Sequence, residues 1–218
     1  MDVKILKGIN LFESLEDENL RSVSSHLVRR RFPRNSVIIN EGDTTNSLYI
    51  ILSGKVKVFL NDENGKEVIL NVVNEGDYFG EVSLFDDGRR SASIMTMEDS
   101  EFAVLEKSAF LNCMASNPEL ALTIIRGLTN RLRGLSGSVR NLALMDVYGR
   151  VAHTLLDLAT EKDGLKVVSE KLTYKELAMR VGASSKMVGR VMKDLISGGY
   201  ITRDGKNLII NRDFPSAW

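Results

Sequence analysis

The sequence predicts an α+β protein in which an all-β domain, a long helix and a small helical domain with a β-hairpin follow one another. Three observations support this class. Runs of Val, Ile, Phe and Tyr alternate with turn residues across residues 27–105, which is typical of short β-strands. Apolar residues then recur at helical spacing over residues 125–142. Beyond residue 172, two helix-start signals precede a last pair of β runs.

The N-terminal half is predicted to be mostly β. Residues 9–25 are expected to form a helix before the β pattern begins. Asn64-Gly65 lies between two β runs and is a strong hairpin signal, because both residues tolerate positive φ. Short strands separated by turns at this spacing indicate an all-β barrel or sandwich. The expected strands are Ser36–Asn40, Leu48–Leu52, Val56–Leu60, Val68–Val73, Ala92–Met97 and Glu101–Leu105.

Residues 118–145 are predicted to form one long helix, after a short helix at Ser108–Ser116. Pro118 suits the first turn, where an amide N–H has no partner in any case. Apolar residues spaced alternately by three and four favour a two-helix coiled coil and therefore a homodimer, although a helix laid against its own domain remains the alternative. Three glycines, at 127, 134 and 137, either allow close packing or leave the segment marginally stable. The residues of this apolar seam are Ile125, Leu128, Leu132, Leu135, Val139 and Leu142.

The region after the long helix begins with a further helix and a loop. Asp146 can cap a helix that runs to Ala159. Glu161–Glu170, centred on Asp163-Gly164, is expected to be a loop. Thr173 and Glu176 then have the spacing of a capping box, which marks the start of another helix.

The last 46 residues have the pattern of a winged helix-turn-helix. Gly182 suits a tight turn after the first helix, because glycine adopts positive φ without strain. The second helix has an apolar stripe on one side and three cations on the other. The hairpin Arg203–Lys206 would then be a basic wing, although a purely structural helical hairpin remains the alternative. The residues expected to contact DNA are Thr173, Ser184, Ser185, Lys186, Arg190, Lys193 and Lys206.

Charge is balanced over the whole chain and unbalanced between its parts. The chain has 29 basic and 29 acidic residues. Residues 171–218 hold nine basic and four acidic residues, a net of +5, which leaves −5 on the first 170 residues. A basic C-terminal quarter favours an anionic partner, with double-stranded DNA first, although an asymmetry of this size also arises on ordinary solvated surfaces.

Composition excludes several classes of protein. The single cysteine, Cys113, excludes a disulfide framework, a four-cysteine zinc site and a cysteine-bound iron–sulfur cluster. Two histidines, His26 and His153, leave few options for a histidine-rich metal centre. No run approaches the roughly 18 apolar residues of a transmembrane helix, and the N-terminus lacks the apolar core of a signal peptide. A soluble cytoplasmic protein is expected, with no structural metal, no covalently bound cofactor and no membrane partner.

The segment Phe79–Ala92 predicts a binding site for a cyclic nucleotide. A glycine at position 80 allows the backbone to approach a phosphate closely and to offer it N–H groups. Arg90 can pair with the phosphate charge, and Ser91 adds a hydroxyl donor. Glu81 can accept a hydrogen bond from a ribose 2′-OH. The candidate residues in this segment are Gly80, Glu81, Val82, Ser83, Arg90 and Ser91.

Essentially the whole chain resembles the cyclic-AMP receptor protein / fumarate-nitrate regulator (CRP/FNR) family of bacterial transcription factors. The resemblance implies a β-roll of the cyclic-nucleotide-binding jelly-roll type over residues 1–117, a dimerisation helix over 118–145 and a winged helix-turn-helix over 146–218. It also implies a cytoplasmic homodimer that binds near-palindromic promoter DNA and contacts RNA polymerase. The segments that carry the resemblance are Gly42-Asp43, Leu48–Gly54, Phe79–Ala92, Asn141–Arg150 and Leu172–Asp194.

The chain departs from the family pattern at two places. The cyclic-AMP members have a Thr-Ser pair on the dimer helix that reads adenine, and the resemblance places Leu135 and Ser136 there. Leucine cannot donate the corresponding hydrogen bond. Many relatives have an Arg-Glu pair on the recognition helix where this chain has Ser185-Lys186, while Arg190 is retained. Because glutamate accepts from cytosine and lysine donates to guanine or phosphate, the preferred half-site is expected to differ.

The sequence therefore predicts an effector-responsive regulator of transcription without catalytic activity. The expected effector is a nucleotide with a phosphodiester, either cyclic AMP or cyclic di-GMP. Two alternatives remain open: a cyclic-nucleotide-binding regulatory subunit of an enzyme, and a constitutive DNA binder whose β-roll is only a scaffold. The iron–sulfur sensors of the family need four cysteines, and the haem-type sensors need an axial histidine in the β domain or the nearby hinge. Neither His26 nor His153 lies there.

Overall fold

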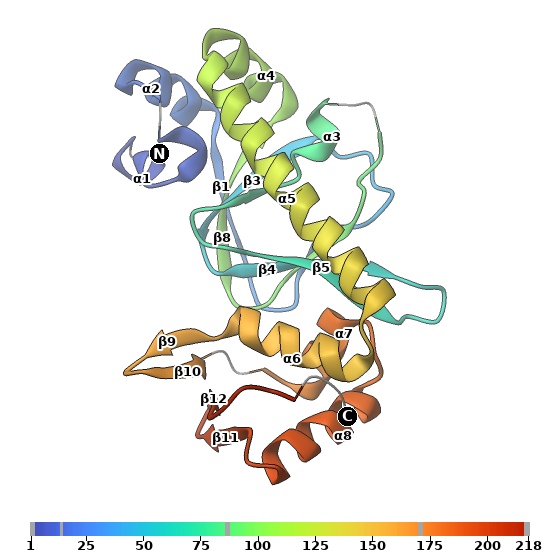
Figure 1. The fold of residues 1–218 in the computed structure, drawn as a ribbon. Helices are drawn as coiled ribbons and strands as arrows, with labels where there is room; N and C mark the ends of the chain where they lie inside the picture. Colours follow the sequence, from blue (N-terminus) through green and yellow to red (C-terminus); the bar gives the residue numbers. More distant parts are fainter. Residues whose placement is uncertain (1–2, 14, 86–87, 170–171, 216–218) are drawn as a thin grey trace. The chain divides into compact units, whose positions relative to one another are not determined.

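The computed structural model describes residues 3–13, 15–85, 88–169 and 172–215. The chain divides into two compact units, Met1–Arg133 and Gly134–Trp218. One long helix, α5 (Pro118–Leu144), begins in the first unit and ends in the second (Figure 1). Within the described ranges, no helix is both long enough and apolar enough to cross a membrane.

The first unit is built on two antiparallel sheets of four strands each, with strand orders β1-β8-β3-β6 and β2-β7-β4-β5. The predicted all-β domain is confirmed. All six expected strands are present, each within one residue of its expected ends. The strands are β1 (Val28–Phe32), β2 (Val37–Ile39), β3 (Ser47–Ser53), β4 (Lys55–Asn61), β5 (Glu67–Asn74), β6 (Tyr78–Phe79), β7 (Ser93–Thr96) and β8 (Ser100–Glu106).

Strand β8 is buried on both faces, which explains its almost unbroken apolar sequence. Phe102 and Val104 face a core to which all eight strands except β1 contribute a buried residue. Ala103 and Leu105 face the opposite way, into a second core that is shared with the N-terminal helices. Successive side chains of a strand point to opposite faces, so a central strand between two cores loses the polar alternation of a surface strand.

The N-terminal segment differs from its expected form. Residues 9–25 do not form one helix, because the described residues between α1 and α2 contain only a short 3-10 turn. Leu11, Phe12 and Leu15 are buried, as are two apolar residues of the following helix, Leu20 and Val23. On one continuous helix these side chains would spread around about half of the circumference, so a bend buries them better. The helices here are α1 (Val3–Lys7), η1 (Asn10–Phe12) and α2 (Asp17–His26).

Besides α1, three short elements of the first unit were not predicted. Strand β1 pairs only with β8, at the edge of its sheet, and carries three exposed arginines, so it shows no apolar alternation. Strand β6 has only two residues, and α3 (Val82–Phe85) is a single turn. The expected helix at 108–116 is present as α4 (Lys107–Ser116).

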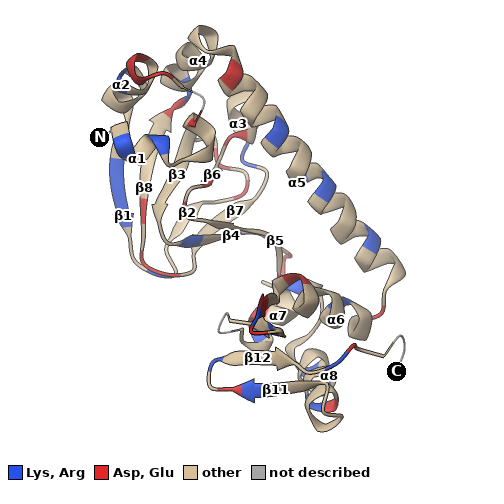
Figure 2. Ribbon diagram, turned by 60° about the vertical axis from the view of Figure 1, so that its left-hand side comes forward, with Lys and Arg blue, Asp and Glu red and all other residues tan. Residues whose placement is uncertain are grey.

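Helix α5 has apolar residues on two sides. Leu120 and Ile124 are buried and, with the half-buried Leu128, pack against the core of the N-terminal helices. Leu128, one of the predicted seam residues, therefore faces its own unit. The other seam residues have exposed fractions between 41% and 65%, and arginines recur between them (Figure 2). These exposed residues are Ile125, Leu132, Leu135, Val139 and Leu142.

The three glycines of α5 have different surroundings, although the helix is continuous through all of them. A Cβ atom added to Gly127 would overlap the hydroxyl oxygen of Tyr78 on β6. A Cβ at Gly134 or Gly137 would meet nothing within 4 Å in this chain. Close packing against Tyr78 therefore explains Gly127.

The second unit contains the predicted helix-turn-helix. Gly182, in the turn between the two helices, has a φ of +64°, which glycine adopts without strain. Each helix begins with a predicted side-chain cap. The side chain of Asp146 accepts a hydrogen bond from the amide of Gly149 at 2.7 Å. Thr173 accepts in the same way from the amide of Glu176 at 3.1 Å, and Ser184 from the amide of Met187 at 3.2 Å. The helices are α6 (Val147–Leu158), α7 (Tyr174–Val181) and α8 (Ser185–Ser197).

The wing is larger than expected, because the loop predicted at residues 161–170 is wrong. Its described residues belong to a hairpin, with Asp163 and Gly164 at φ values of +52° and +77°, the backbone of a tight two-residue turn. The flanking strands are short and mostly exposed, so their sequences lack a β alternation. The sheet order is β11-β12-β10-β9. Its strands are β9 (Thr160–Lys162), β10 (Leu165–Val168), β11 (Ile201–Asp204) and β12 (Asn207–Ile210).

We expect Gly127→Ala to destabilise the fold by about 1–2 kcal/mol. The overlap with the Tyr78 hydroxyl is severe and costs about 2–3 kcal/mol, the upper part of the range for overpacking, and the better helix propensity of alanine offsets about 1 kcal/mol of it. Adding Tyr78→Phe should recover most of the loss, because it removes the overlapping oxygen, which has no hydrogen-bond partner among the described residues. Denaturant unfolding measures both variants. A Gly127→Ala protein as stable as the wild type would contradict this packing.

Candidate functional site

The turn after β6 needs a glycine at position 80. Gly80 has a φ of +85°, and an added Cβ would lie 2.8 Å from both the carbonyl oxygen of Ser47 and a guanidinium nitrogen of Arg90. The turn therefore brings the backbone against the arginine ten residues later. The two glycine-dependent features, positive φ and close approach, coincide at the position where the sequence predicts a phosphate contact.

Arg90 is buried, with 4% of its surface exposed. Its guanidinium donates hydrogen bonds to Thr45 Oγ1 at 3.2 Å, to the carbonyl oxygen of Gly80 at 2.7 Å and to that of Ser47 at 2.9 Å. Burial lowers the pKa of Arg90 from its ordinary value, since removing a cation from water disfavours the charged form. Three of its five N–H groups are thus used to fix the side chain, and two remain for a ligand.

Glu81 pairs with Arg131, a residue that the sequence reasoning missed. Glu81 has 2% of its surface exposed, and its carboxylate forms an ion pair with the guanidinium of Arg131 on α5. Arg131 also donates to the carbonyl oxygen of Tyr78, and its guanidinium carbon lies 4.8 Å from the centre of the Tyr78 ring. Burial raises the pKa of Tyr78 to about 12. In the sequence, Arg131 is one of several polar residues of a helix. Which of them faces the turn after β6 depends on how the helix packs against the sheet, and the sequence pattern does not show that packing.

All six residues predicted from the segment 79–92 line one pocket of about 70 Å³, together with Arg131. Ser91 and Val82 are exposed at its edge, while Ser83 is buried. The pocket is smaller than the roughly 300–1,000 Å³ of typical ligand sites. It combines two cations, one carboxylate and two serine hydroxyl groups around a turn with an accessible backbone. Such a set can bind an anion and a hydroxyl-bearing group side by side.

Leu135 and Ser136, the other predicted effector contacts, do not line this pocket. Both lie on the exposed part of α5 that belongs to the second unit. Their assignment stays a prediction.

The surface of α8 has the expected division between buried and exposed residues. Val188, Val191 and Leu195 are buried against α6 and α7. The three predicted cations are exposed, and none forms an ion pair with a described residue. The predicted DNA contacts exposed on this unit are Thr173, Ser184, Ser185, Lys186, Arg190, Lys193 and Lys206.

Arg150 on α6 holds the helix-turn-helix in place and was not singled out by the sequence. Its Nε donates to the carbonyl oxygen of Val181 at 2.8 Å, at the end of α7, and its Nη1 to that of Met145 at 2.8 Å. The Arg150 side chain thus provides a hydrogen-bond donor to the last carbonyl of α7 and to a carbonyl in the segment before α6.

Among the described residues, no cluster of three or more His, Cys, Asp or Glu side chains could hold a metal ion. Cys113 is partly buried, and burial raises the pKa of its thiol.

Two family models match different parts of the chain. Residues 29–117 match the cyclic nucleotide-binding domain. Residues 149–215 match the Crp-like helix-turn-helix domain. The matched ranges contain the pocket segment and the α7–α8 surface respectively.

Several characterised proteins are similar over nearly the whole chain. The CRP-like cAMP-activated global transcriptional regulator of Mycobacterium tuberculosis is 34% identical over 212 residues, 95% of either chain. The cAMP-activated global transcriptional regulator CRP of Escherichia coli O157:H7 is 35% identical over 201 residues, 89% of this chain and 94% of that one.

Solved structures of regulators share this fold. The c-di-GMP responsive global regulator CLP of Xanthomonas campestris has a TM-score of 0.78 and 26% identity, covering 89% of this chain and 99% of its own. The catabolite activator protein of Thermus thermophilus has a TM-score of 0.56 and 31% identity, covering 93% of each chain.

We expect Arg131→Met to destabilise the first unit by about 3 kcal/mol, because it leaves the buried Glu81 carboxylate without a partner. Glu81→Gln added to Arg131→Met should recover much of that loss, since a neutral amide is easier to bury. A double-mutant cycle in denaturant should therefore give a coupling energy of about 1–3 kcal/mol. Strictly additive losses would contradict the ion pair.

Proposed function

The chain belongs to the CRP/FNR family of effector-responsive, DNA-binding regulators of transcription, and we propose that it acts as a homodimer controlled by a cyclic nucleotide. One observation carries the proposal: the same chain holds a pocket built from a buried arginine, a buried carboxylate and a glycine turn, and a helix-turn-helix whose exposed cations on α8 form no ion pair with a described residue. In this proposal the protein works in the cytoplasm on near-palindromic promoter DNA, contacts RNA polymerase and catalyses no reaction.

The proposed effector has a cyclic phosphodiester, as in cyclic AMP or cyclic di-GMP. The two N–H groups of Arg90 that have no acceptor among the described residues would donate to phosphate oxygens, together with the exposed hydroxyl of Ser91. Glu81 would accept a hydrogen bond from a ribose hydroxyl once Arg131 moves from it. A volume of about 70 Å³ is too small for a whole nucleotide. Because Arg131 lines the pocket, its displacement would enlarge the space for the ligand.

Leu135 and Ser136 are proposed as the contacts to the base. Ser136 has a hydroxyl that can hydrogen-bond to a base edge, and Leu135 offers an apolar surface, 41% exposed, on which a base can lie. Because leucine has no donor, base recognition would depend more on stacking and shape than in cyclic-AMP readers with two hydroxyl groups. The names of the similar regulators support both nucleotides, since the M. tuberculosis protein is described as cAMP-activated and the X. campestris protein as c-di-GMP responsive.

DNA binding is proposed through α8 in the major groove. The first turn of α8 would present Ser185 and Lys186 to base edges, and Arg190 would follow one turn later. A lysine donates to guanine or phosphate, so an acceptor-rich base edge suits this position. The remaining exposed residues of the surface would contact backbone phosphates. These are Thr173, Ser184, Lys193 and Lys206.

The homodimer is proposed to form through the exposed part of the seam. Five large apolar side chains at heptad spacing are exposed on one stripe of α5, and a soluble chain rarely leaves such a stripe unpaired. Leu128 is not part of this surface, because it packs against its own unit.

We expect Arg90→Gln to weaken the binding of cyclic nucleotide at least tenfold, because amide N–H groups replace a charged donor facing phosphate. Titration calorimetry with cyclic AMP and, separately, with cyclic di-GMP measures the affinity. The matched control is Arg89→Gln, since Arg89 is exposed and does not line the pocket. DNA retention with and without the bound nucleotide then shows whether the effector controls DNA binding.

Equal affinity in the two glutamine variants would remove Arg90 from the proposed site. A wild-type protein that binds neither nucleotide, yet binds DNA, would favour a constitutive DNA binder whose β-roll is a scaffold. Melting curves of both variants check that the three hydrogen bonds lost at Arg90 have not unfolded the pocket.

We expect Leu132→Asp combined with Val139→Asp to convert the dimer to monomers. Two carboxylates in an apolar interface lack partners and repel their copies across a two-fold axis. Sedimentation velocity measures the mass. Asn130→Asp with Asn141→Asp adds the same charge away from the seam and should remain dimeric. A seam variant that stays dimeric would contradict the proposed interface.

A further inference from the structure

Arg90 is held by a loop that lies outside the segment from which the pocket was predicted. This loop, residues 40–46, connects β2 to β3. It forms two backbone hydrogen bonds with Arg90. The amide of Gly42 donates to the carbonyl oxygen of Arg90 at 2.9 Å, and the amide of Arg90 donates to the carbonyl oxygen of Asp43 at 2.8 Å. The loop is therefore attached directly to the residue that carries the proposed phosphate contact.

Further hydrogen bonds fix the backbone at the start of this loop. The carboxylate of Asp43 accepts from the amide of Asn40 at 3.0 Å, and the amide of Asp43 donates to the carbonyl oxygen of Asn40 at 3.2 Å. The amide of Glu41 donates to Oγ of Ser93 on β7 at 3.0 Å. The side chains that follow Asp43 therefore extend from a fixed position beside Arg90.

Among the described residues, Thr45 alone accepts a hydrogen bond from Arg90 through its side chain. Its Oγ1 accepts from Nε at 3.2 Å, whereas the acceptors for Nη1 and Nη2 are the backbone carbonyl oxygens of Gly80 and Ser47. Nε has a single hydrogen, and this contact uses it. Nη1 and Nη2 have two hydrogens each, so each keeps one that no described residue accepts. A phosphate would therefore bind at the Nη1–Nη2 end of the guanidinium.

We propose that Thr45 is a positioning residue of the effector site, whose hydroxyl holds Nε of Arg90 so that Nη1 and Nη2 are presented to the phosphate. This inference rests on the proposed function, because it gives Thr45 a role in the binding of a cyclic nucleotide. Thr45 does not line the pocket, so it acts through Arg90. A side chain whose direction is already fixed loses less freedom when it binds a ligand, which favours affinity. The sequence did not single out Thr45, because its contact is with a residue 45 positions away.

The test measures the affinity of the full-length protein for cyclic AMP and, separately, for cyclic di-GMP by titration calorimetry. Thr45→Val puts a methyl group in the place of the hydroxyl, so the hydrogen bond to Nε is lost while the shape is kept. Losing one hydrogen bond to a charged group should weaken binding by roughly tenfold. Thr45→Ser keeps the hydroxyl and should restore binding. The matched control is Thr44→Val, because the exposed side chain of Thr44 forms no hydrogen bond with a described residue.

A double-mutant cycle shows whether Thr45 acts through Arg90. Thr45→Val added to Arg90→Gln should weaken binding by no more than about twofold beyond Arg90→Gln alone, because the guanidinium that Thr45 positions is then absent. A general loosening of the loop would instead lower the affinity by the same factor in both backgrounds. Melting curves check that every variant is folded.

Three results would overturn the positioning role. They are a Thr45→Val protein that binds as tightly as Thr44→Val, a Thr45→Ser protein that binds no better than Thr45→Val, and an undiminished tenfold loss in the Arg90→Gln background. A wild-type protein that binds neither nucleotide would instead contradict the proposed function.

Discussion

The contact between α5 and β6 is the constraint on which both the pocket and the exposed seam depend. Gly127 admits the Tyr78 hydroxyl to the helix surface, and Arg131, one turn later, pairs with Glu81 and lies over the Tyr78 ring. Contacts at two successive turns fix the rotation of a helix about its own axis. With that rotation set, Ile124 faces the core while Leu132 and Val139 are exposed. The same contact therefore decides what α5 offers to the pocket and what it leaves for another surface.

The pocket is a set of buried charges that the protein itself satisfies. Arg90 is bonded to two carbonyl oxygens and a hydroxyl, and the Glu81 carboxylate is paired with Arg131. Buried charges are tolerated only when they are paired and hydrogen-bonded. A ligand hydroxyl that donates a hydrogen bond to Glu81 must compete with Arg131 for that carboxylate. In the proposed function, this competition would weaken the ion pair between Arg131 and Glu81, which connects α5 to the turn after β6. Effector binding would therefore change how α5 is held.

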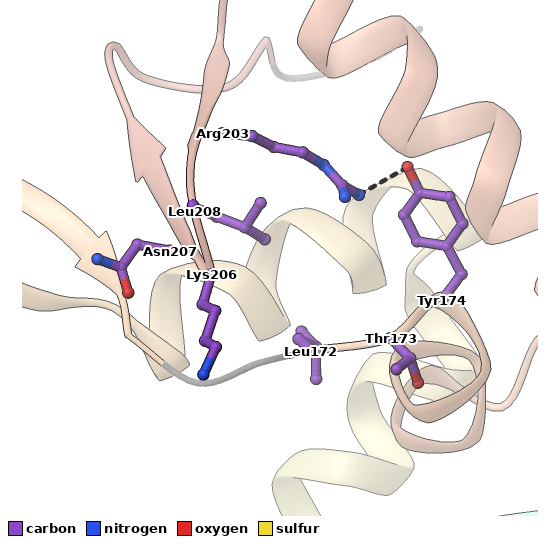
Figure 3. A pocket seen from close by; sticks show the side chains of 8 residues that line it. Leu172, Thr173, Tyr174, Arg203, Lys206, Asn207 and Leu208 are labelled. Atoms are coloured by element: carbon purple, nitrogen blue, oxygen red, sulfur yellow. Dashed lines mark hydrogen bonds between the residues drawn. The ribbon is translucent and has the colours of Figure 1, made fainter.

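In the second unit, the cations of α8 form no ion pair with any residue that the structure describes. The caps and buried carbonyls of this unit are satisfied by Asp146, Thr173, Ser184 and Arg150, so the frame of the helix-turn-helix is fixed without using the cations of α8. Arg203 on β11 donates a hydrogen bond to the neutral hydroxyl of Tyr174 at 2.8 Å, as Figure 3 shows, and keeps its full charge for a partner. Cations that are fixed in direction but not paired lose little freedom when they bind an anion, which favours binding.

The sequence by itself determined the elements whose signals are local. The caps at Asp146, Thr173 and Ser184 and the left-handed Gly182 each depend on atoms within a few residues, so spacing alone predicts them. The six apolar strands and the Gly80–Arg90 half of the pocket follow from the same kind of short-range pattern. Tertiary structure decided the rest: the pairing of Arg131 with Glu81, 50 residues apart, the inward face of Leu128, the β9–β10 hairpin and the contact of Arg203 with Tyr174. These depend on how a helix is rotated and which strands become neighbours, and that register is set by the packing of residues distant in sequence.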